Sequence, residues 1–474
     1  MTTDSTKTPG AGTGGVDTAA PTLPTAQAAP LLAALLVAVF AFQLNASMLS
    51  PALATMTREL NTTDAAIGMS QTAFFTAAAL FSLFLPRWGD LVGRKKILLG
   101  MLLVTGLGCV ISALAQGVTM LFIGRIIQGV AGPVVPLCLI MLRAHVANDK
   151  QYALLMAILT SINGGIAGVD ALAGGWLADH LGFRSIFWTM AIICAIAAVA
   201  IFARVGETFA EVRMPMDWAG TVPLVVALAG ILLAFNEAGK LADANWVLAG
   251  VELLIGIVAF VVFWKVESAS THPLVSTHYL AQRRTWALLL TTTLTMTGVF
   301  AVMNGLVPNL AQAETGANMS ADVVSWWTLT PYALAGLLMG PIAGRMAAGM
   351  GYIRVLQIGL LGTVVGLGAL ATMVDHITGP MLLGVSIFVG ITYAGITNIM
   401  LNGLGIVLSP ADNQGYLPGM NAGAFNMGAG LSFAVLFAVL TATDFRIATL
   451  AGMGILLAAL AASFLIPKPE TLAA

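Results

Sequence analysis

Two ionisable side chains lie deep inside long apolar stretches of this sequence. Arg125 falls within the stretch 120–142 and Asp170 within 152–177, and each stretch is long enough to cross a membrane as a helix. At 1.5 Å of rise per residue, Arg125 and Asp170 lie about 8 Å and about 10 Å from the helix ends on one common side. Because an unpaired charge in a medium of low dielectric constant is costly, we predict that they form an ion pair.

Such a pair could couple the movement of a solute to that of a proton. Protonation of Asp170 would free Arg125 to hold an anionic or strongly polar substrate, and deprotonation would restore the pair. We therefore predict Asp170 as the proton-titrating group and Arg125 as its partner. Two plainer interpretations stay open: a permanent structural salt bridge, and an arginine satisfied by backbone carbonyl groups.

Uncharged polar and aromatic side chains recur in the other apolar stretches. Amide groups both donate and accept hydrogen bonds, and aromatic faces stack on planar solutes, so these residue types suit a small polar organic substrate. The candidate substrate-binding residues are Gln43, Asn45, Gln128, Asn163, Asn304, Tyr332, Tyr393 and Asn398. The three cysteines and five histidines lack the spacing of metal ligands, so we expect no metal and no cofactor.

The composition requires a lipid environment for the elements that position these residues. Of 474 residues, 58% are hydrophobic and only 9% are charged, and the mean hydropathy is +0.93. Soluble domains usually contain about 25% charged residues, so a soluble globule is excluded. The net charge of −1 gives no basic surface for nucleic acid, and nucleic acid is not expected as a partner.

Apolar stretches of membrane-spanning length recur in a pattern of six, two and six. We predict an all-α membrane protein with fourteen transmembrane helices, in which two six-helix halves flank an inserted helix pair. The boundaries are a disordered cytoplasmic tail at 1–29, an N-terminal half at 30–204, an inserted pair with linkers at 205–284, a C-terminal half at 285–467 and a cytoplasmic tail at 468–474.

The basic residues predict the orientation of these helices. With the N-terminal tail in the cytoplasm, fifteen Lys and Arg residues fall on the cytoplasmic side and four on the other. Cytoplasmic loops carry such an excess, which favours both termini inside the cell. We expect a multi-pass protein of the cell membrane, working as a monomer.

A short motif follows the second predicted helix. The segment 89–96 reads Gly-Asp-Leu-Val-Gly-Arg-Lys-Lys, and 86–90 and 341–345 share a Pro and a Gly three residues apart ahead of a charge. The motif resembles that of the major facilitator superfamily, although Pro86 stands where the family usually has Gly. The resemblance implies a latch between the halves that breaks when the cavity opens. The implied gating residues are Asp90, Gly93, Arg94 and Lys95.

A second segment narrows the resemblance. Residues 125–129, Arg-Ile-Ile-Gln-Gly, resemble the intramembrane arginine motif of this superfamily, and the helix pattern resembles its fourteen-helix drug and proton antiporter branch. Two positions depart from that branch. Asn45 replaces an acid in the first helix, and Asp170-Ala171 replaces a Gly-Pro step in the fifth.

These departures favour one function over the family default. We predict a secondary active transporter, proton-coupled as symporter or antiporter, that takes up or exchanges a small neutral or anionic solute such as an aromatic acid or a purine like urate. Proton-driven multidrug efflux is the alternative, and a transport-dead membrane sensor is a remote one. An enzyme would need converging catalytic groups, which the sequence does not show.

Overall fold

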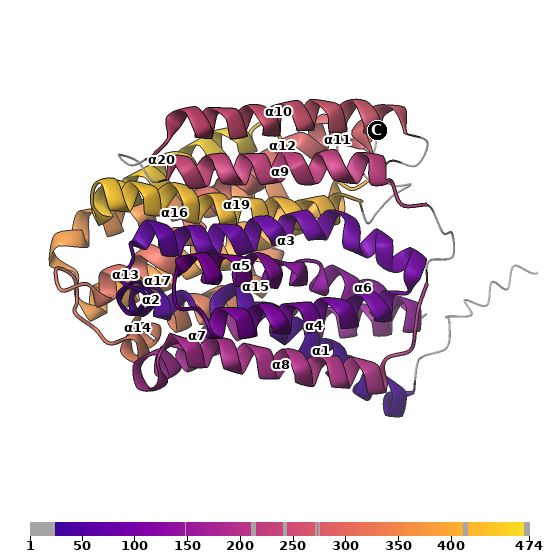
Figure 1. Cartoon of the computed structure of the whole chain (residues 1–474), viewed down its shortest axis with the longest axis horizontal. Helices are drawn as coiled ribbons and strands as arrows, with labels where there is room; N and C mark the ends of the chain where they lie inside the picture. Colours follow the sequence, from indigo (N-terminus) through magenta and orange to yellow (C-terminus); the bar gives the residue numbers. More distant parts are fainter. Residues whose placement is uncertain are drawn as a thin grey trace, which may run out of the picture.

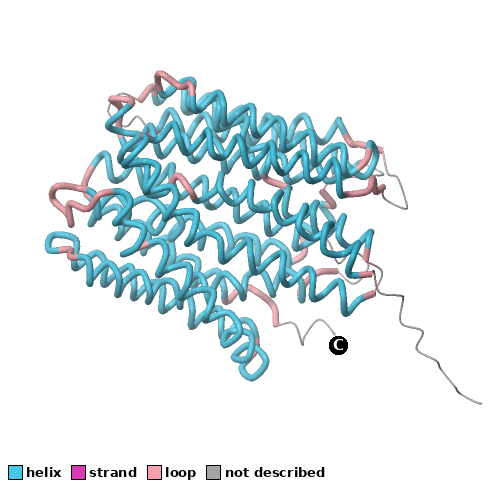
Figure 2. Tube along the Cα trace, turned by 90° about the horizontal axis from the view of Figure 1, so that it is seen from below, coloured by secondary structure: helices cyan, strands magenta, loops and turns pink. Residues whose placement is uncertain are grey.

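The structure is a computed structural model, and it describes residues 24–146, 148–209, 215–239, 244–270, 273, 275–410 and 416–468. Every regular element in this described part is a helix, and the helices lie side by side as long rods joined by short turns (Figure 1, Figure 2). The expected tail at 1–29 lies mostly outside the described residues, but α1 already begins at Thr25.

The first six rods alternate in direction along the chain. They are α1 (Thr25–Ser47) with η1 (Ser50–Ala52) and α2 (Leu53–Glu59), α3 (Asp64–Val92), α4 (Arg94–Ala113), α5 (Val118–Gln128) with η2 (Gly129–Ala131) and α6 (Val134–His145), α7 (Asp149–Leu181), and α8 (Phe183–Arg204). We call the end of the bundle where α1 begins the terminus end. The opposite end, where α2 ends and α3 begins, is the distal end.

Two rods and a short helix separate these six from the last six. They are α9 (Trp218–Ala238), α10 (Trp246–Ala269) and α11 (Thr277–Leu280). The last six rods are α12 (Arg283–Ala301) with η4 (Val302–Leu306) and α13 (Val307–Gln312), α14 (Ala321–Trp327) with α15 (Leu329–Met350), α16 (Tyr352–Met373) with η5 (Val374–His376), α17 (Gly379–Val389) with η6 (Gly390–Thr397) and α18 (Asn398–Val407), α19 (Tyr416–Ala442), and α20 (Phe445–Ser463).

The fourteen-helix prediction agrees with this arrangement. Among the described residues, thirteen helical stretches have both the length and the hydropathy to cross a bilayer. The remaining rod is α7, which is 33 residues long and therefore about 50 Å in length. Because every backbone group of a helix is paired within it, long helices are the form that such apolar runs adopt in lipid.

Helix boundaries differ from the sequence-based expectation at one instructive place. Pro86 lies inside α3, and Pro341 lies inside α15, so neither proline marks a turn. The turns come later, at Gly93 and Gly351, whose φ angles of 121° and 85° suit glycine. The matched Pro and Gly pairs therefore lie toward the ends of two equivalent helices.

Regular α-helix is interrupted in the four rods that begin with α1, α5, α12 and α17. Short 3₁₀ segments, η1 and η2, follow α1 and α5, and π-helical segments, η4 and η6, follow α12 and α17. Such interruptions leave room for side chains and are frequent at functional sites. These four rods also carry most of the residues that we predict to bind substrate; the exceptions are Asn163 on α7 and Tyr332 on α15.

The two groups of six rods meet along two lines. On one line α3 packs against α19, where the Thr72 hydroxyl donates to the Gly430 carbonyl at 2.8 Å. On the other line α7 packs against α14 and α15. The rods α9 and α10 pair with each other along one edge of the bundle in Figure 1, and α9 lies beside α3 and α19.

Candidate functional site

Arg125 is fully buried, and its guanidinium group is held by the first six rods. Nη1 and Nη2 donate to the backbone carbonyl of Asn45 at 3.2 and 3.3 Å. Nη1 also donates to Gln128 Oε1 at 2.6 Å, and Nη2 donates to Gln71 Oε1 at 2.8 Å. The Phe74 ring covers the guanidinium, with 4.2 Å from Cζ to the ring centroid.

The residues around Arg125 are themselves fixed by α4. Gln128 Nε2 donates to the Gly108 carbonyl at 3.0 Å and to the Ser112 hydroxyl at 2.8 Å. The Cys109 thiol lies 3.3 Å from Asn45 Oδ1. Gln128 and Asn45, both predicted to bind substrate, are therefore buried supports of the arginine in this structure.

Asp170 is also buried, but it faces a different partner. Its Oδ2 accepts a hydrogen bond from the Ser47 hydroxyl. The Gln43 carbonyl oxygen, 3.0 Å from Ser47 Oγ, competes for the same hydroxyl proton, and Ser47 Oγ accepts from Gln43 Nε2 at 2.9 Å. Among the described side chains, Asp170 Oδ1 has no hydrogen-bond partner.

The predicted ion pair between Arg125 and Asp170 is therefore not formed in the part of the chain that the structure describes. Both charges contact the same short segment of α1, Arg125 at Asn45 and Asp170 at Ser47. The physical reason is orientation around the helix axis: equal depth brings residues to one level, but side chains at one level can point in different directions. For Arg125, the plainer interpretation of backbone carbonyl partners describes the structure better.

Two supports of Arg125 were not predicted from the sequence. Gln71 and Phe74 lie on α3, where amide and aromatic residues carry no charge that would mark them as unusual. Both residues lie about two to three turns into α3. That their side chains face Arg125 can be recognised only once the packing of the helices is known. Asn163, which we predicted to bind substrate, lies in a part of α7 whose side chains are outside the described residues.

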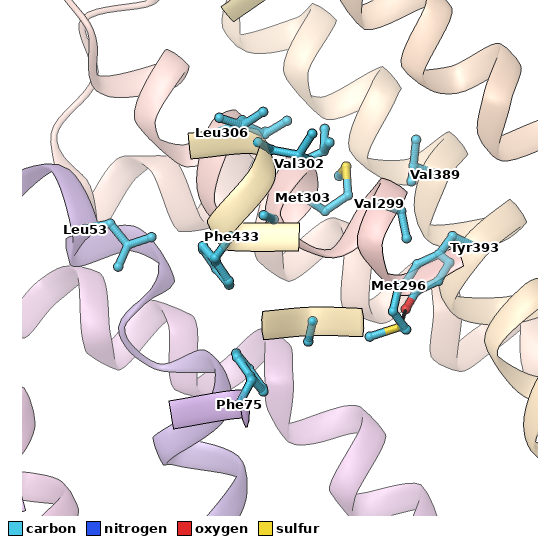
Figure 3. Packing of buried hydrophobic residues seen from close by; sticks show 14 of the residues in the cluster. Leu53, Phe75, Met296, Val299, Val302, Met303, Leu306, Val389, Tyr393 and Phe433 are labelled. Atoms are coloured by element: carbon cyan, nitrogen blue, oxygen red, sulfur yellow. Dashed lines mark hydrogen bonds between the residues drawn. The ribbon is translucent and has the colours of Figure 1, made fainter. Parts of the chain in front are cut away.

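The other candidates lie in the last six rods and contact one another less closely. Tyr332 and Tyr393 have nearly parallel rings, with an interplanar angle of 10° and 6.4 Å between centroids. The Tyr393 hydroxyl points to the Met296 sulfur at 2.8 Å, as Figure 3 shows. Asn304 Nδ2 donates to the Phe300 carbonyl at 3.0 Å.

Asn398, the remaining candidate, lies where η6 passes into α18. Its side-chain oxygen accepts a hydrogen bond from Asn402 Nδ2 at 3.0 Å, and its backbone carbonyl accepts one from the same amide at 2.9 Å. Asn398 is half-buried, in contrast to the fully buried amides around Arg125. Its side chain is thus more open to a solute.

The turn between α3 and α4 carries the predicted gating residues. Arg94 Nε forms an ion pair with Asp90 Oδ1 at 2.7 Å. The Glu207 carboxylate accepts from the Lys95 backbone N–H at 2.8 Å, and a Cβ atom on Gly93 would lie within 2.7 Å of that carboxylate. These bonds join the turn to the segment after α8, and a latch between the two halves stays a prediction.

Glu207 was not predicted as a gating residue. It follows the last helix of the first half directly, and it also accepts from the Thr208 backbone N–H at 3.1 Å. The Arg94 backbone N–H donates to the Thr208 carbonyl at 3.0 Å. An acid placed next to a basic cluster on the same side of the membrane is the signal that could have found it.

Two surface hollows, of about 310 Å³ and about 250 Å³, lie on the flanks of the bundle. The first lies between α1 and α8, and the second between α16 and α17. Neither contains a predicted site residue. Among the described residues, no cluster of His, Cys, Asp and Glu could hold a metal ion.

The sequence matches a known family over most of its length. The family model described as Major Facilitator Superfamily matches residues 35–432. The chain belongs to this superfamily. It is therefore a multi-pass membrane transporter of a small solute, and the resemblance seen in the segments 89–96 and 125–129 is confirmed at the level of the family.

Relatives within the superfamily have different substrates. The chain is 59% identical over 416 residues to the uridine/deoxyuridine transporter of Lactococcus lactis subsp. cremoris (strain MG1363), and the match covers 87% of each chain. It is 25% identical over 353 residues to the multidrug transporter protein MdtP of Bacillus subtilis (strain 168), over 72% of this chain and 62% of that one.

Solved superfamily structures share the fold at low sequence identity. The crystal structure of the nucleoside transporter NupG has a TM-score of 0.64 and 13% identity, and the match covers 92% of this chain and 100% of that one. At this identity the likeness shows the fold alone. The four interrupted rods, which begin with α1, α5, α12 and α17, therefore belong to a fold shared with a solved transporter.

Proposed function

We propose that this protein takes up neutral pyrimidine nucleosides, uridine and deoxyuridine, across the cell membrane. The observation that carries the proposal is the 59% identity with a uridine/deoxyuridine transporter over 87% of both chains. The proposed solute is neutral, as the sequence favoured, but it is a nucleoside and not an aromatic acid or a purine. The relationship to a multidrug transporter is far weaker, at 25% identity.

The polarity of the last six rods supports a neutral solute. Among their described residues no charged side chain is buried, whereas amides and tyrosines lie at mid-depth. Amides pair with carbonyl and hydroxyl groups of a nucleoside, and aromatic side chains supply apolar contact to it. We assign contacts to the substrate to Asn304, Tyr332, Tyr393 and Asn398, with Gln43 opposite them on α1.

Transport is proposed to proceed by rocking of the N-terminal half, 30–204, against the C-terminal half, 285–467. Hydrogen bonds between the halves gather toward the distal end in the described chain. Gln312 Nε2 donates to the Pro51 carbonyl at 2.9 Å, and the Asp322 backbone N–H donates to Asp179 Oδ2 at 2.8 Å. These bonds must break for the cavity to open to the distal side.

The same line of contact continues toward the middle of the bundle. The Ser325 hydroxyl donates to the Ala171 carbonyl at 2.8 Å, and the Thr330 hydroxyl donates to the Gly168 carbonyl at 2.7 Å. These contacts support a state that is closed at the distal end.

Proton coupling is proposed to use Asp170. Its bond to Ser47 and its unpartnered Oδ1 among the described side chains place a buried carboxyl beside α1, the rod that also holds Arg125 through Asn45. A change in the charge of Asp170 alters its hydrogen bond with Ser47 on α1. A resulting shift of α1 would then alter the hydrogen bonds that Arg125 donates to the Asn45 carbonyl. We place both termini in the cytoplasm, so that the distal end of the bundle faces the outside of the cell. We also propose that the protein works as a monomer.

The proposal is tested by uptake of tritium-labelled uridine in a bacterial host that lacks its own nucleoside uptake. We expect accumulation that unlabelled deoxyuridine competes with and that a proton ionophore abolishes. Uptake without sensitivity to the ionophore would remove the proton coupling but keep the substrate. No uptake, together with resistance of the host to several unrelated drugs, would replace nucleoside import by multidrug efflux.

A further inference from the structure

Three phenylalanine rings meet where the two halves of the protein contact each other. Phe75 on α3 and Phe433 on α19 are nearly parallel, with an interplanar angle of 8° and 6.2 Å between centroids. Phe300 on α12 stands edge-on to both, at 83° to Phe75 and 78° to Phe433. We propose that these rings, which we call the phenylalanine box, bind the pyrimidine base of the transported nucleoside.

The two parallel rings of the box could enclose a planar guest after a movement of the helices. A base placed between two parallel rings needs about 7 Å between them, twice the contact distance of about 3.5 Å between carbon atoms. The Phe75 and Phe433 centroids lie 6.2 Å apart, and because a centroid distance includes any sideways offset, the gap between the ring planes is at most this. The rings are therefore closed on each other in this structure, and α3 must move away from α19 to admit a base between them.

The position of the box fits a site that both sides of the membrane reach in turn. Phe75 lies 11 residues after the start of α3, and Phe433 lies nine residues before the end of α19. At 1.5 Å per residue, these rings are about 16 Å and about 14 Å from the distal helix ends, near the middle of a bilayer about 30 Å thick. Figure 3 shows both rings within the core between the two groups of rods.

The close approach of α3 and α19 beside the box holds it closed in this structure. A Cβ atom on Gly430 would lie 3.3 Å from Phe75 Cβ and 3.1 Å from the Thr76 hydroxyl oxygen. The Thr72 hydroxyl donates to the Gly430 carbonyl at 2.8 Å, one helical turn from Phe433. The two parallel walls thus belong to different halves but are positioned by one tight contact.

A hydrogen-bond donor without a partner lies next to the box. Gln71 Nε2 is buried and has no hydrogen-bond partner among the described residues, although Gln71 Oε1 accepts from Arg125. Gln71 and Phe75 are four residues apart on α3 and so lie on one face of the helix. A buried amide of this kind is satisfied by a base carbonyl oxygen, which uracil carries at two positions.

This inference rests on the proposed nucleoside uptake and adds a coupling device to it. Because Phe75 belongs to the first half and Phe433 to the second, a base bound between them contacts both halves at once. Gln71 connects the same site to the Arg125 cluster. A base bound in the box therefore changes the interface between the two halves, on which the rocking motion depends. It also changes the hydrogen bonding of Gln71, which supports the buried Arg125.

The test uses full-length protein in proteoliposomes and the kinetics of uridine uptake. Phe433→Leu and Phe75→Leu remove a stacking face, and we expect each to raise KM for uridine at least about fivefold, since a stacked base contributes about 1–3 kcal/mol. Uracil alone should compete with uridine and lose potency by the same factor in these variants, whereas ribose alone should not compete. Phe433→Tyr keeps a ring face and should raise KM less than Phe433→Leu does.

Phe437→Leu is the matched control. The Phe437 ring lies 5.4 Å from Phe433 on the same helix, but it packs against Gly68 and Gly305 and is not part of the box. We expect its KM to stay unchanged. An equal rise of KM in Phe437→Leu, or an unchanged KM in both box variants, would overturn the proposal by assigning the rings to the apolar core alone.

A second measurement covers the case in which the leucine variants do not fold. Phe433→Trp retains an aromatic wall and adds a fluorophore, and we expect uridine to quench its emission more than it quenches that of the natural protein. Equal quenching in both proteins would contradict the box. Absence of uridine uptake by the natural protein would instead remove the proposed function, whereas normal uptake with normal KM in the box variants removes the box alone.

Discussion

The first six and the last six rods differ in what makes their interiors polar. The first six bury two charged groups, Arg125 and Asp170, within a set of hydrogen bonds that centres on α1. The last six bury no charged side chain among their described residues, and their regular helix gives way to the π-helical segments η4 and η6. The fold repeats, but the polar content does not.

This difference assigns separate tasks to the two halves. A buried charge changes its surroundings strongly when it gains or loses a proton, so the first half is suited to coupling. A π-helical segment shifts the register of side chains without adding charge, so the second half is suited to shaping a pocket for a neutral solute. Variants of the buried charges of the first half should therefore affect coupling, whereas variants of the uncharged pocket residues should affect apparent affinity.

The largest effect is expected from Arg125→Lys. An ammonium group cannot reproduce the planar fork that donates to the Asn45 carbonyl, Gln71 and Gln128 at once, so buried acceptors lose their donors. We expect uridine uptake to fall at least about a hundredfold and the free energy of unfolding to fall by about 3–5 kcal/mol. Transport assays and denaturation in detergent measure the two effects.

The matched control for this change is Arg204→Lys, at the exposed end of α8. This variant makes the same Arg-to-Lys substitution at an exposed position, where water can replace any hydrogen bond that the guanidinium group loses. Uptake should therefore remain within about twofold of that of the natural protein. Normal uptake in Arg125→Lys would contradict a role for the guanidinium geometry and with it the contrast between the halves.

Asp170→Asn should have the second largest effect, on coupling more than on binding. The amide can keep a hydrogen bond to Ser47, but it cannot exchange a proton. We expect uridine accumulation against a gradient to be lost, while exchange of labelled for unlabelled uridine persists and becomes independent of pH. Uptake and exchange measured between about pH 5 and pH 8 test this.

Asp375→Asn supplies the comparison for Asp170. Asp375 is exposed near the distal end, where it pairs with Arg446, so its carboxyl is solvated and should not contribute to coupling. We expect the natural pH profile in this variant. The same profile in Asp170→Asn would show that the buried carboxyl does not carry the transported proton.

The fold could be predicted well from the sequence because apolar length alone decides where a chain crosses lipid. The Arg125 site was predicted only in part. Depth along a helix follows from residue number, but the direction of a side chain around the axis depends on packing, so the expected pair with Asp170 does not occur among the described residues. Gln71 and the phenylalanine box were missed because uncharged residues in an apolar run look like core until neighbouring helices are known.

The turns after α3 and α15 provide a smaller test of the same contrast. Gly93→Ala places a methyl group at a positive φ and within 2.7 Å of the Glu207 carboxylate, whereas at Gly351 no atom lies within 4 Å of an added Cβ. We expect backbone strain to lower the free energy of unfolding by about 1–3 kcal/mol in both variants. Gly93→Ala should lose about 1 kcal/mol more, since the bond from Glu207 to Lys95 is displaced.

Thermal denaturation of the two alanine variants side by side measures this difference. Glu207→Gln is a useful addition, because it keeps the size of the side chain but weakens its bonds to backbone N–H groups. It should reduce the difference between Gly93→Ala and Gly351→Ala when combined with each. Equal stabilities of the two alanine variants in the natural background would mean that Glu207 does not hold the first turn.

The smallest effect is expected from Tyr393→Phe in the second half. The change removes one hydrogen bond, from the hydroxyl to the Met296 sulfur, but keeps the ring that lies parallel to Tyr332. We expect the free energy of unfolding to fall by about 0.5–1.5 kcal/mol and KM for uridine to change less than about threefold, with the pH profile unaltered. A flattened pH profile in this variant would place part of the coupling in the second half. The separation of tasks between charged and uncharged halves would then have to be abandoned.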